Sequence, residues 1–526
     1  MRHRYVFASF VAFIAMSSAS GGYWGPLLTP ASVGWPDGCC GIHLVHLNGG
    51  KFLVWGYGTN SGGEETKTWI WNAFTGDFTG PHMISGANIF CCGLSQLPDG
   101  RAIVAGGNDA QTAVGIKDAF IFNPTTNTWT LPGVVGMLNE TRWYPTLAAL
   151  ADGTITAISG WGEPGGEFFP PPTWRSRVDI FNATLNIWGD FAPTFNPPGV
   201  TFQPHFYPFM IPYHDPQDNV PKLFFAGKST ANDIGIGHTT NSYSLRFTNT
   251  TYNNGAAEWR PLGGVSDIQG SGAVIMIGRT NPIDVGTVYK FGGKFGGIAL
   301  DLGRKIDLNS LAPDWTETHI MNTPRAECNI VAMANGRIAA VGGTSDPDPH
   351  SSFSTAIRTI EIYNPAMDTW SETSPDASAT RMYHSTASMT PNATILTAGG
   401  EFLPDTGGSQ TVQEINAQEY YPSYFLSPTP RPVIVSKLNY AAWNSILTVR
   451  ATGTIDYFSL LKLSSTTHAN DMTQRFIKLT ESQPPSGEYY YLKMPANGGI
   501  APPGYYMLSA VAGDFPSVAR YIRIGQ

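Results

Sequence analysis

A repeated segment constrains this chain more than any other feature. Each copy has an apolar run, a turn in which Asp or Asn begins the reversal, a second apolar run, and a closing pair of small residues, usually Gly-Gly. Clear copies turn at Asp99, Asp152, Asn335 and Asn392, and Gly49-Gly50-Lys51 opens a degenerate first copy. Such a repeat predicts a series of small antiparallel sheets instead of one continuous core.

Five tryptophans mark the same repeat. They are Trp129, Trp188, Trp259, Trp315 and Trp370, spaced 55 to 71 residues apart, and each follows a strand-like run. A period near 50 with Gly-Gly and Trp marks is typical of kelch repeats. A single four-stranded unit cannot bury both of its faces, so we expect radial stacking, with each tryptophan filling the gap between blades. The sequence therefore predicts an all-β chain with a seven-bladed kelch-type β-propeller between about residues 40 and 425.

The composition changes after residue 424. Pro428, Pro430 and Pro432 have the character of a linker, and residues 433–526 carry short strand-like runs. This pattern predicts an immunoglobulin-like β-sandwich of about 100 residues. We therefore expect a signal peptide at 1–20, the propeller at 21–427 and the C-terminal sandwich at 428–526.

The first 20 residues have the pattern of a secretory signal. Arg2 and Arg4 give a basic start, the apolar run 5–16 is too short to span a membrane, and small residues at 18–20 suit cleavage. An ordinary buried strand is the alternative. Secretion is compatible with glycosylation at the four N-x-[ST] sequons, which begin at Asn139, Asn182, Asn249 and Asn392.

Charge and cysteine usage narrow the function classes. The net charge of −8 gives no electrostatic reason to bind nucleic acid, and no later apolar run is long enough to cross a membrane. The five cysteines are Cys39, Cys40, Cys91, Cys92 and Cys328, and they lack zinc spacing. Because the number is odd, at least one has no disulfide partner. Cys39 or Cys40 either bridges to Cys92 or stays a thiol.

Counting back eight residues from each turn gives one equivalent position per repeat. These positions hold Cys91, Tyr144, Glu327 and His384. Equivalent positions are related by the propeller axis, so we expect these side chains to form a ring near one mouth of the central channel. Any one of these residues could be an ordinary buried core residue. A thiol, a phenol, a carboxylate and an imidazole at the same position of four repeats instead suit a redox metal, and imidazole is a ligand that fits copper.

Four short motifs at these positions resemble the galactose oxidase and glyoxal oxidase family of copper radical oxidases. They are Phe90-Cys91-Cys92-Gly93, Arg142-Trp143-Tyr144-Pro145-Thr146, Arg381-Met382-Tyr383-His384-Ser385 and Thr466-Thr467-His468. The resemblance covers nearly the whole chain after residue 20, and the second motif is similar to the glyoxal oxidase branch.

The resemblance implies a role for each matching residue. Cys91 and Tyr144 would be joined by a thioether, and the linked phenol would bind one copper ion and store an oxidising equivalent as a radical. His384 and His468 would be imidazole ligands, and Tyr383 would be the axial phenolate and the base. Since neighbouring strand residues point to opposite faces, Tyr383 and His384 can share a metal only if the backbone there is irregular.

Three further residues are candidates near substrate. Trp161 would shield the linked tyrosine by stacking, unless it fills a gap between blades. Glu327 stands where galactose oxidase has an aromatic, so it would bind a hydrated aldehyde or hydroxyl, or act as a base outside the metal ligands. Arg325, two residues earlier, either joins that role or forms an ion pair with Glu327 that has no catalytic meaning.

We therefore expect a secreted, monomeric oxidase that converts small aldehydes, as hydrates, to carboxylic acids and reduces O2 to H2O2. Because only about 20 residues separate the signal peptide from the first blade, we expect no N-terminal carbohydrate-binding domain. A primary-alcohol or galactose-type oxidase is the alternative, and a non-catalytic secreted kelch protein that binds glycans or proteins is a third. Peroxide-using enzymes are possible downstream partners.

Overall fold

The computed structural model consists almost entirely of β-strands and turns, with two single-turn 3-10 helices at Phe353–Thr355 and Ser423–Phe425. It describes residues 21–29, 40–57, 65–108, 114–160, 177–191, 193–195, 204, 206–228, 242–249, 256–263, 272–295, 297–348, 351–405 and 410–525. The predicted signal peptide lies outside these ranges. Across them, no helix has the length and apolar character needed to cross a membrane.

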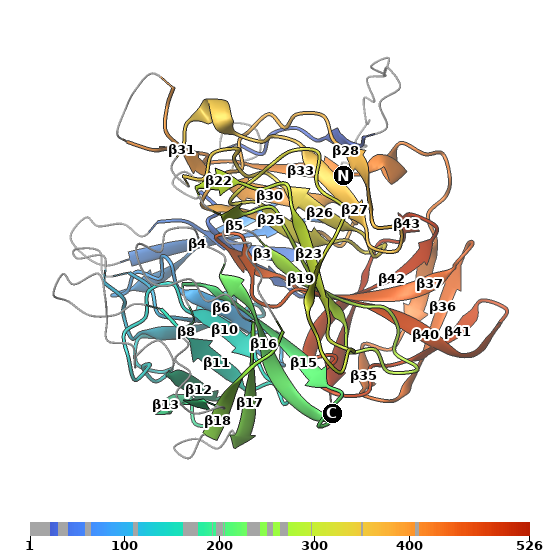
Figure 1. The fold of residues 1–526 in the computed structure, drawn as a ribbon, viewed down its shortest axis with the longest axis horizontal. Helices are drawn as coiled ribbons and strands as arrows, with labels where there is room; N and C mark the ends of the chain where they lie inside the picture. The colour runs from blue at the N-terminus through green and yellow to red at the C-terminus, as the bar shows by residue number, and fades with distance from the viewer. Residues whose placement is uncertain are drawn as a thin grey trace, which may run out of the picture.

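Six separate sheets of the propeller follow one another along the chain (Figure 1). Their strands are β2 (His43–Leu47), β3 (Lys51–Trp55), β4 (Glu65–Asn72) and β5 (Phe78–Ser85); β6 (Gly93–Gln96), β7 (Ala102–Ala105), β8 (Ala119–Asn123) and β9 (Thr128–Trp129); β10 (Thr146–Ala149), β11 (Ile155–Ile158), β12 (Val178–Asn182) and β13 (Ile187–Phe191); β15 (Pro208–Asp215), β16 (Val220–Lys228), β17 (Tyr243–Asn249) and β18 (Ala256–Pro261), with β14 (Thr194–Phe195) at the outer edge; β25 (Asn329–Ala332), β26 (Ile338–Val341), β27 (Ile360–Asn364) and β28 (Thr369–Thr373); and β29 (Ser385–Met389), β30 (Ile395–Gly399), β33 (Ala417–Tyr421) and β1 (Tyr23–Trp24).

A further four-stranded unit continues into the C-terminal part of the chain. Its strands are β19 (Ala273–Ile277), β20 (Thr287–Phe291), β23 (Gly303–Asp307) and β24 (Trp315–Glu317), and β19 pairs in parallel with β40 (Arg475–Ser486). The repeat did not predict how the ring closes. Strand β1, from the start of the described chain, pairs antiparallel with β33 and completes the last sheet.

The glycine pairs of the repeat have a packing role between sheets. Gly107 N donates to the carbonyl of Arg142, Gly293 N to that of Arg325, and Gly343 N to that of Arg381. These bonds cross from one sheet to the next, and a Cβ at Gly106 or Gly342 would collide with the same backbone. The pair is therefore small because two backbones meet there.

The repeat tryptophans pack between sheets, as the sequence predicts. Trp129 Nε1 donates to Thr68 Oγ1 of the preceding sheet at 3.0 Å, and Trp315 Nε1 donates to Ser242 Oγ at 2.7 Å. The ring of Trp370 meets that of Phe291 at 4.9 Å between centroids. Each of these tryptophans lies on the outermost strand of its own unit and reaches back to the one before.

The C-terminal strands, orange and red in Figure 1, surround one apolar core. They are β34 (Val433–Lys437), β35 (Tyr440–Ala442), β36 (Ile446–Thr452), β37 (Tyr457–Lys462), β40, β41 (Tyr489–Lys493), β42 (Gly504–Ala512), β43 (Phe515–Pro516) and β44 (Arg520–Gly525). Leu447, Leu460, Ile477 and Leu508 are typical of the buried side chains.

A short hairpin from this part of the chain enters the propeller. Its strands are β38 (Ser465–Thr467) and β39 (Asn470–Asp471), and β38 pairs antiparallel with the inner strand β2. Gln474 bonds the backbone of Ala332 and Ile330, and Met472 Sδ accepts from Leu94 N and Leu147 N at 3.4 Å. The hairpin thus satisfies backbone groups along inner strands of several sheets.

The cysteines that the structure describes are free thiols, which was one of the two expectations from the sequence. Cys40, Cys91, Cys92 and Cys328 are all buried thiols, so no bridge joins Cys40 to Cys92. Cys39 lies outside the described residues. The Cys40 thiol donates to Gln413 Oε1 at 3.2 Å.

Candidate metal centre

The predicted ring positions share an unusual backbone conformation. Cys91, Tyr144, Glu327 and His384 have φ values of 60°, 61°, 55° and 61°. Non-glycine residues seldom adopt this left-handed region, and such residues cluster at functional sites. Each lies just before the inner strand of its sheet, so the four residues selected by repeat spacing are structurally equivalent.

The ring has two more members that the spacing did not reveal. Gly41, with φ of 66°, precedes β2, and Tyr207, with φ of 44°, precedes β15. The repeat marks of both sheets are degenerate in sequence. Tyr207 packs on the Tyr144 ring, with 4.8 Å between centroids.

The left-handed turn also explains how Tyr383 and His384 face one site. Both precede β29, and their rings stack at 4.0 Å between centroids with 27° between planes. A regular strand would direct them to opposite faces. The predicted irregularity at a strand entrance is therefore present at this position.

The hairpin brings His468 to the same place. His468 has φ of 49°, and its ring centroid lies 4.9 Å from that of Tyr144, 5.4 Å from Tyr383 and 4.4 Å from His384. The chain thus brings together residues that are far apart in sequence.

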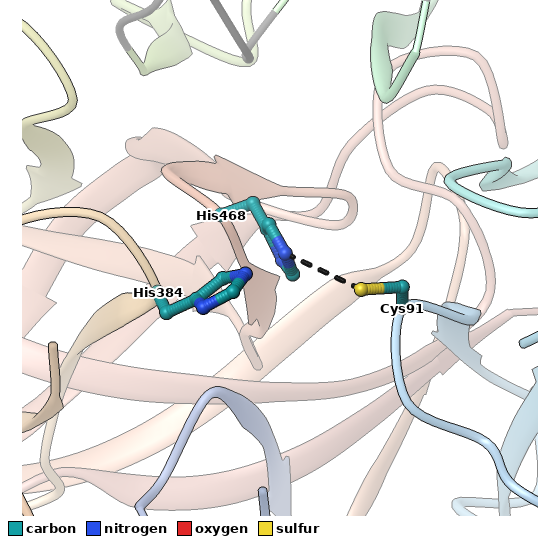
Figure 2. A group of neighbouring side chains, drawn as sticks. All are labelled: Cys91, His384 and His468. Carbon is teal, nitrogen blue, oxygen red and sulfur yellow. Dashed lines mark hydrogen bonds between the residues drawn. The ribbon is translucent and has the colours of Figure 1, made fainter. Parts of the chain in front are cut away.

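The potential ligand atoms converge. A sulfur or nitrogen atom from each of Cys91, His384 and His468 lies within 4.8 Å of the others, and Cys91 Sγ is 3.6 Å from His468 Nε2 (Figure 2). The hydroxyl oxygens of Tyr144 and Tyr383 are 2.8 Å apart. All five side chains are buried, and Cys91 is completely so.

Hydrogen bonds orient His468 toward the centre. Thr467 Oγ1 donates its single proton to the carbonyl of Ile42 at 2.9 Å, so it accepts from His468 Nδ1, which is 2.6 Å away. With the proton on Nδ1, the lone pair of Nε2 faces Cys91. This tautomer suits a metal ligand.

His384 is held in the same manner. Its Nδ1 lies 3.1 Å from Glu401 Oε1 and 3.0 Å from the Tyr57 hydroxyl, which donates to Glu401 Oε2 at 2.7 Å. Its Nε2 is buried and has no hydrogen-bond partner among the described residues. A carboxylate behind an imidazole whose inner nitrogen is unbonded is the common arrangement around bound metals.

The electrostatics of the cluster also favour a cation. Burial raises the pKa of Tyr144 and of Tyr383 well above the ordinary phenol value, and the neighbouring Cys91 raises both further. Burial lowers the pKa of His468, with smaller effects from His384 and His43, so this imidazole is neutral. Two imidazoles and two phenols form a donor set that fits a divalent transition metal such as copper, whose charge would favour the phenolates.

A tryptophan missed in the sequence covers the site. The Trp143 ring stacks on Tyr144, with 4.4 Å between centroids and 22° between planes. Trp161, the predicted stacking residue, lies outside the described residues. The adjacent position of Trp143 in the Arg-Trp-Tyr motif was the available signal.

The possible ion pair between Arg325 and Glu327 does not form. Arg325 Nη2 instead bonds Glu361 Oε1 at 2.5 Å, with both side chains fully buried, and Nη1 bonds the carbonyls of Gly342 and Thr359. The guanidinium therefore braces its own blade. Glu327 is buried, and its carboxylate is one of the charges that raise the pKa of Tyr383.

The other motif arginines are similar braces. Arg142 pairs with Asp179 through Nε at 2.8 Å and Nη2 at 2.7 Å, and both side chains are buried. Arg381 bonds Thr397 Oγ1, the Gly399 carbonyl and Asn416 Oδ1. The arginines of two motifs thus fix the strand entrances that carry Tyr144 and His384.

The chain is similar to several known proteins. The family model for the galactose oxidase-like early set domain matches residues 431–524. A galactose oxidase of Gibberella zeae is 25% identical over 96% of this chain and 71% of its own length. An aldehyde oxidase of Vitis pseudoreticulata, of the glyoxal oxidase type, is 23% identical over 83% of this chain and 82% of its own length. A fungal alcohol oxidase solved in complex with copper has the same fold, with a TM-score of 0.75 and 22% identity, over 96% of this chain and all of the other.

Proposed function

Because the chain is related to the galactose oxidase and glyoxal oxidase family of copper radical oxidases, we propose that it is itself a copper radical oxidase. One observation supports this most strongly. Two phenols and two inward-facing imidazoles converge beside the Cys91 thiol, from segments more than 370 residues apart.

The proposed ligands are the phenol oxygens of Tyr144 and Tyr383 and the Nε2 atoms of His384 and His468. We assign Cys91 to a thioether with Tyr144 because the two residues occupy neighbouring ring positions, where Tyr144 N donates to the Cys91 carbonyl at 3.0 Å. Bound copper would supply a one-electron acceptor, which together with an oxidising equivalent on Tyr144 allows two-electron oxidation without an organic cofactor.

The chain's own groups then have separate tasks. Tyr383, as phenolate, would take the hydroxyl proton of substrate. The 2.8 Å between the hydroxyl oxygens of Tyr144 and Tyr383 supports a role for both at one reacting carbon. The stacked Trp143 excludes water from one face of Tyr144. Glu401 and Tyr57 hold the His384 ring.

We propose small aldehydes, as hydrates, as the substrates. The hydrate loses two hydrogens to give the carboxylic acid, and O2 gains them to become H2O2. Glu327 supports this choice, because a buried carboxylate near Tyr383 accepts hydrogen bonds from a gem-diol better than it packs against a sugar. Primary alcohols are the second candidate class, favoured by the structural similarity to an alcohol oxidase.

The remaining predictions belong to the same proposal. The unit β19–β20–β23–β24 would be the seventh blade of a propeller at 21–427, and residues 428–526 would form an immunoglobulin-like sandwich. The chain would be secreted after cleavage of residues 1–20, act as a monomer, and bear glycans at Asn139, Asn182, Asn249 and Asn392. Asn139 is exposed, whereas Asn182, Asn249 and Asn392 are half-buried, although the Asn139 amide already bonds Asp179 at 2.8 Å.

The test is peroxide release by the copper-loaded protein with methylglyoxal, galactose and benzyl alcohol in parallel. We expect the highest rate with methylglyoxal, and loss of activity in Tyr383→Phe with copper still bound. Absence of peroxide across a broad set of aldehydes and alcohols, at full copper occupancy, would leave the non-catalytic binding protein. Intact mass gives a second readout, since the thioether removes two hydrogens and Cys91→Ser should abolish that loss.

A further inference from the structure

The backbone N–H of Cys91 has a different kind of hydrogen-bond acceptor from the N–H groups of Tyr144 and Tyr207. Tyr144 N donates to the carbonyl of Cys91 at 3.0 Å, and Tyr207 N donates to the carbonyl of Tyr144 at 2.9 Å. At these two positions a ring residue thus bonds the one before it. By the same rule Cys91 N would donate to Gly41, but it donates to the His43 Nε2 atom at 3.0 Å.

The Gly41 carbonyl has another partner. It accepts from Thr386 Oγ1 at 2.8 Å, across the junction with the last sheet. An imidazole therefore replaces a backbone acceptor at the one ring position that holds the cysteine. The left-handed conformation of Cys91, with φ of 60°, depends on this side chain for its N–H bond.

His43 is rigidly placed for this contact. It is the first residue of β2, it is completely buried, and its ring stacks on Trp55 at 4.9 Å with 14° between planes. The edge of Phe90 meets it at 6.0 Å. These rings leave the imidazole little freedom to rotate.

One of the two ring nitrogens of His43 has no hydrogen-bond partner among the described residues. Because Nε2 accepts from Cys91 N, the single proton of the neutral ring lies on Nδ1, where it has no partner among the described residues. An unsatisfied buried donor destabilises a fold, so its presence requires a compensating role. A leucine or phenylalanine would fill this space without that cost.

We propose that His43 is a positioning residue for the Cys91–Tyr144 thioether, which rests on the proposed function above. By holding Cys91 N, it keeps Sγ beside the Tyr144 ring. The net step consumes the thiol hydrogen, one ring hydrogen and O2, and it yields a carbon–sulfur bond and H2O2. His43 takes no part in this electron transfer and acts only through the backbone of Cys91.

Three substitutions separate this role from general packing. In His43→Gln, the amide oxygen replaces the Nε2 acceptor, whereas His43→Asn places its polar group near the former Nδ1 and His43→Leu removes the acceptor. His46→Leu is the matched control. His46 is buried on the same strand, but its Nε2 bonds Tyr521, away from the metal centre.

The copper-free protein is mixed with Cu(II) in air, and the fraction with the two-hydrogen mass loss is followed by intact mass spectrometry. We expect wild type, His46→Leu and His43→Gln to form the thioether at rates within about threefold of one another. The Asn and Leu variants should be about tenfold slower or more, as the loss of one buried hydrogen bond implies. Copper affinity, measured by competition titration, should stay unchanged in all of them.

Each outcome is informative. Equal rates in wild type, His43→Asn and His43→Leu would overturn the role of His43 while leaving the oxidase proposal intact. If the wild type never loses two hydrogens, the thioether itself is absent and the proposed function fails at that point. If His43→Leu does not fold, the comparison of Gln with Asn decides, and equal rates for these two would overturn the inference.

Discussion

Lys462 lies at the base of the hairpin that carries His468, and replacing it should stabilise the protein in a pH-dependent way. It ends β37 and is buried, with one hydrogen bond from Nζ to the Pro503 carbonyl at 3.1 Å and the Tyr506 ring at 4.7 Å from Nζ. The charged group facing it is another cation, Arg475. Burial, with repulsion from Arg475, lowers the pKa of Lys462 from 10.5 to about 7.

The sign and size follow from proton linkage. Between pH 7 and 10.5 the unfolded chain binds a proton that the folded protein does not, so stability rises with pH across this window. At about 1.4 kcal/mol per pH unit, the difference between 10.5 and about 7 corresponds to roughly 5 kcal/mol below pH 7. Lys462→Met removes this penalty but loses the hydrogen bond and the ring contact, together about 1–3 kcal/mol. We expect the free energy of unfolding of Lys462→Met to exceed that of the wild type by about 2–4 kcal/mol at pH 6, provided that both proteins adopt the same fold.

The assay is urea unfolding of the copper-loaded wild type and variant at pH 6, 7, 8 and 9, followed by tryptophan fluorescence. The advantage of Lys462→Met should shrink by roughly 2–3 kcal/mol between pH 7 and 9. Lys478→Met is the control, since Lys478 is exposed and its Nζ also lies over a tyrosine ring, Tyr457, at 4.4 Å. An advantage that stays constant with pH would refute the linkage, and destabilisation at every pH would show that Lys462 is better solvated than its burial implies.

Three further predictions concern the site and its supports. Glu401→Gln should weaken copper binding by about tenfold, because the carboxylate orients His384, and competition titration would measure it; unchanged affinity would show that Tyr57 suffices. Trp143→Phe should leave the thioether mass loss intact but shorten the lifetime of the oxidised protein, followed by its radical absorption; an unaltered lifetime would remove the shielding role. Arg142→Met should cost about 3–5 kcal/mol in unfolding experiments, since it leaves Asp179 buried and unpaired, and the double variant with Asp179→Leu should recover much of this loss.

Repeat spacing predicted the ring because it reports symmetry. The same position in four repeats holds Cys91, Tyr144, Glu327 and His384. All four have a left-handed backbone conformation, so equivalent sequence positions have the same local structure. The same count from Asp215, at the turn after β15, also reaches Tyr207, but the irregular sequence of that sheet hid the turn from which to count.

The sequence did not predict which side chains from different loops contact each other at the site. Glu401 reaches His384 because β30 returns to the face from which β29 starts, and Tyr57 comes from another sheet altogether. Arg325 lies two residues from Glu327 but pairs with Glu361, since the left-handed turn at Glu327 removes the alternation assumed for a regular strand. The closing strand β1 carries no repeat mark and was likewise invisible.

The hairpin of β38 and β39 sets a temporal order during synthesis. A growing chain presents Cys91, Tyr144, Tyr383 and His384 long before His468 leaves the ribosome, and the ring cannot close until β33 is available for β1. An unfinished or truncated polypeptide therefore lacks one imidazole, and nothing pairs with the inner edge of β2. The proposed ligand set is therefore complete only in the finished, folded chain, so the proposed radical chemistry would be withheld from nascent intermediates.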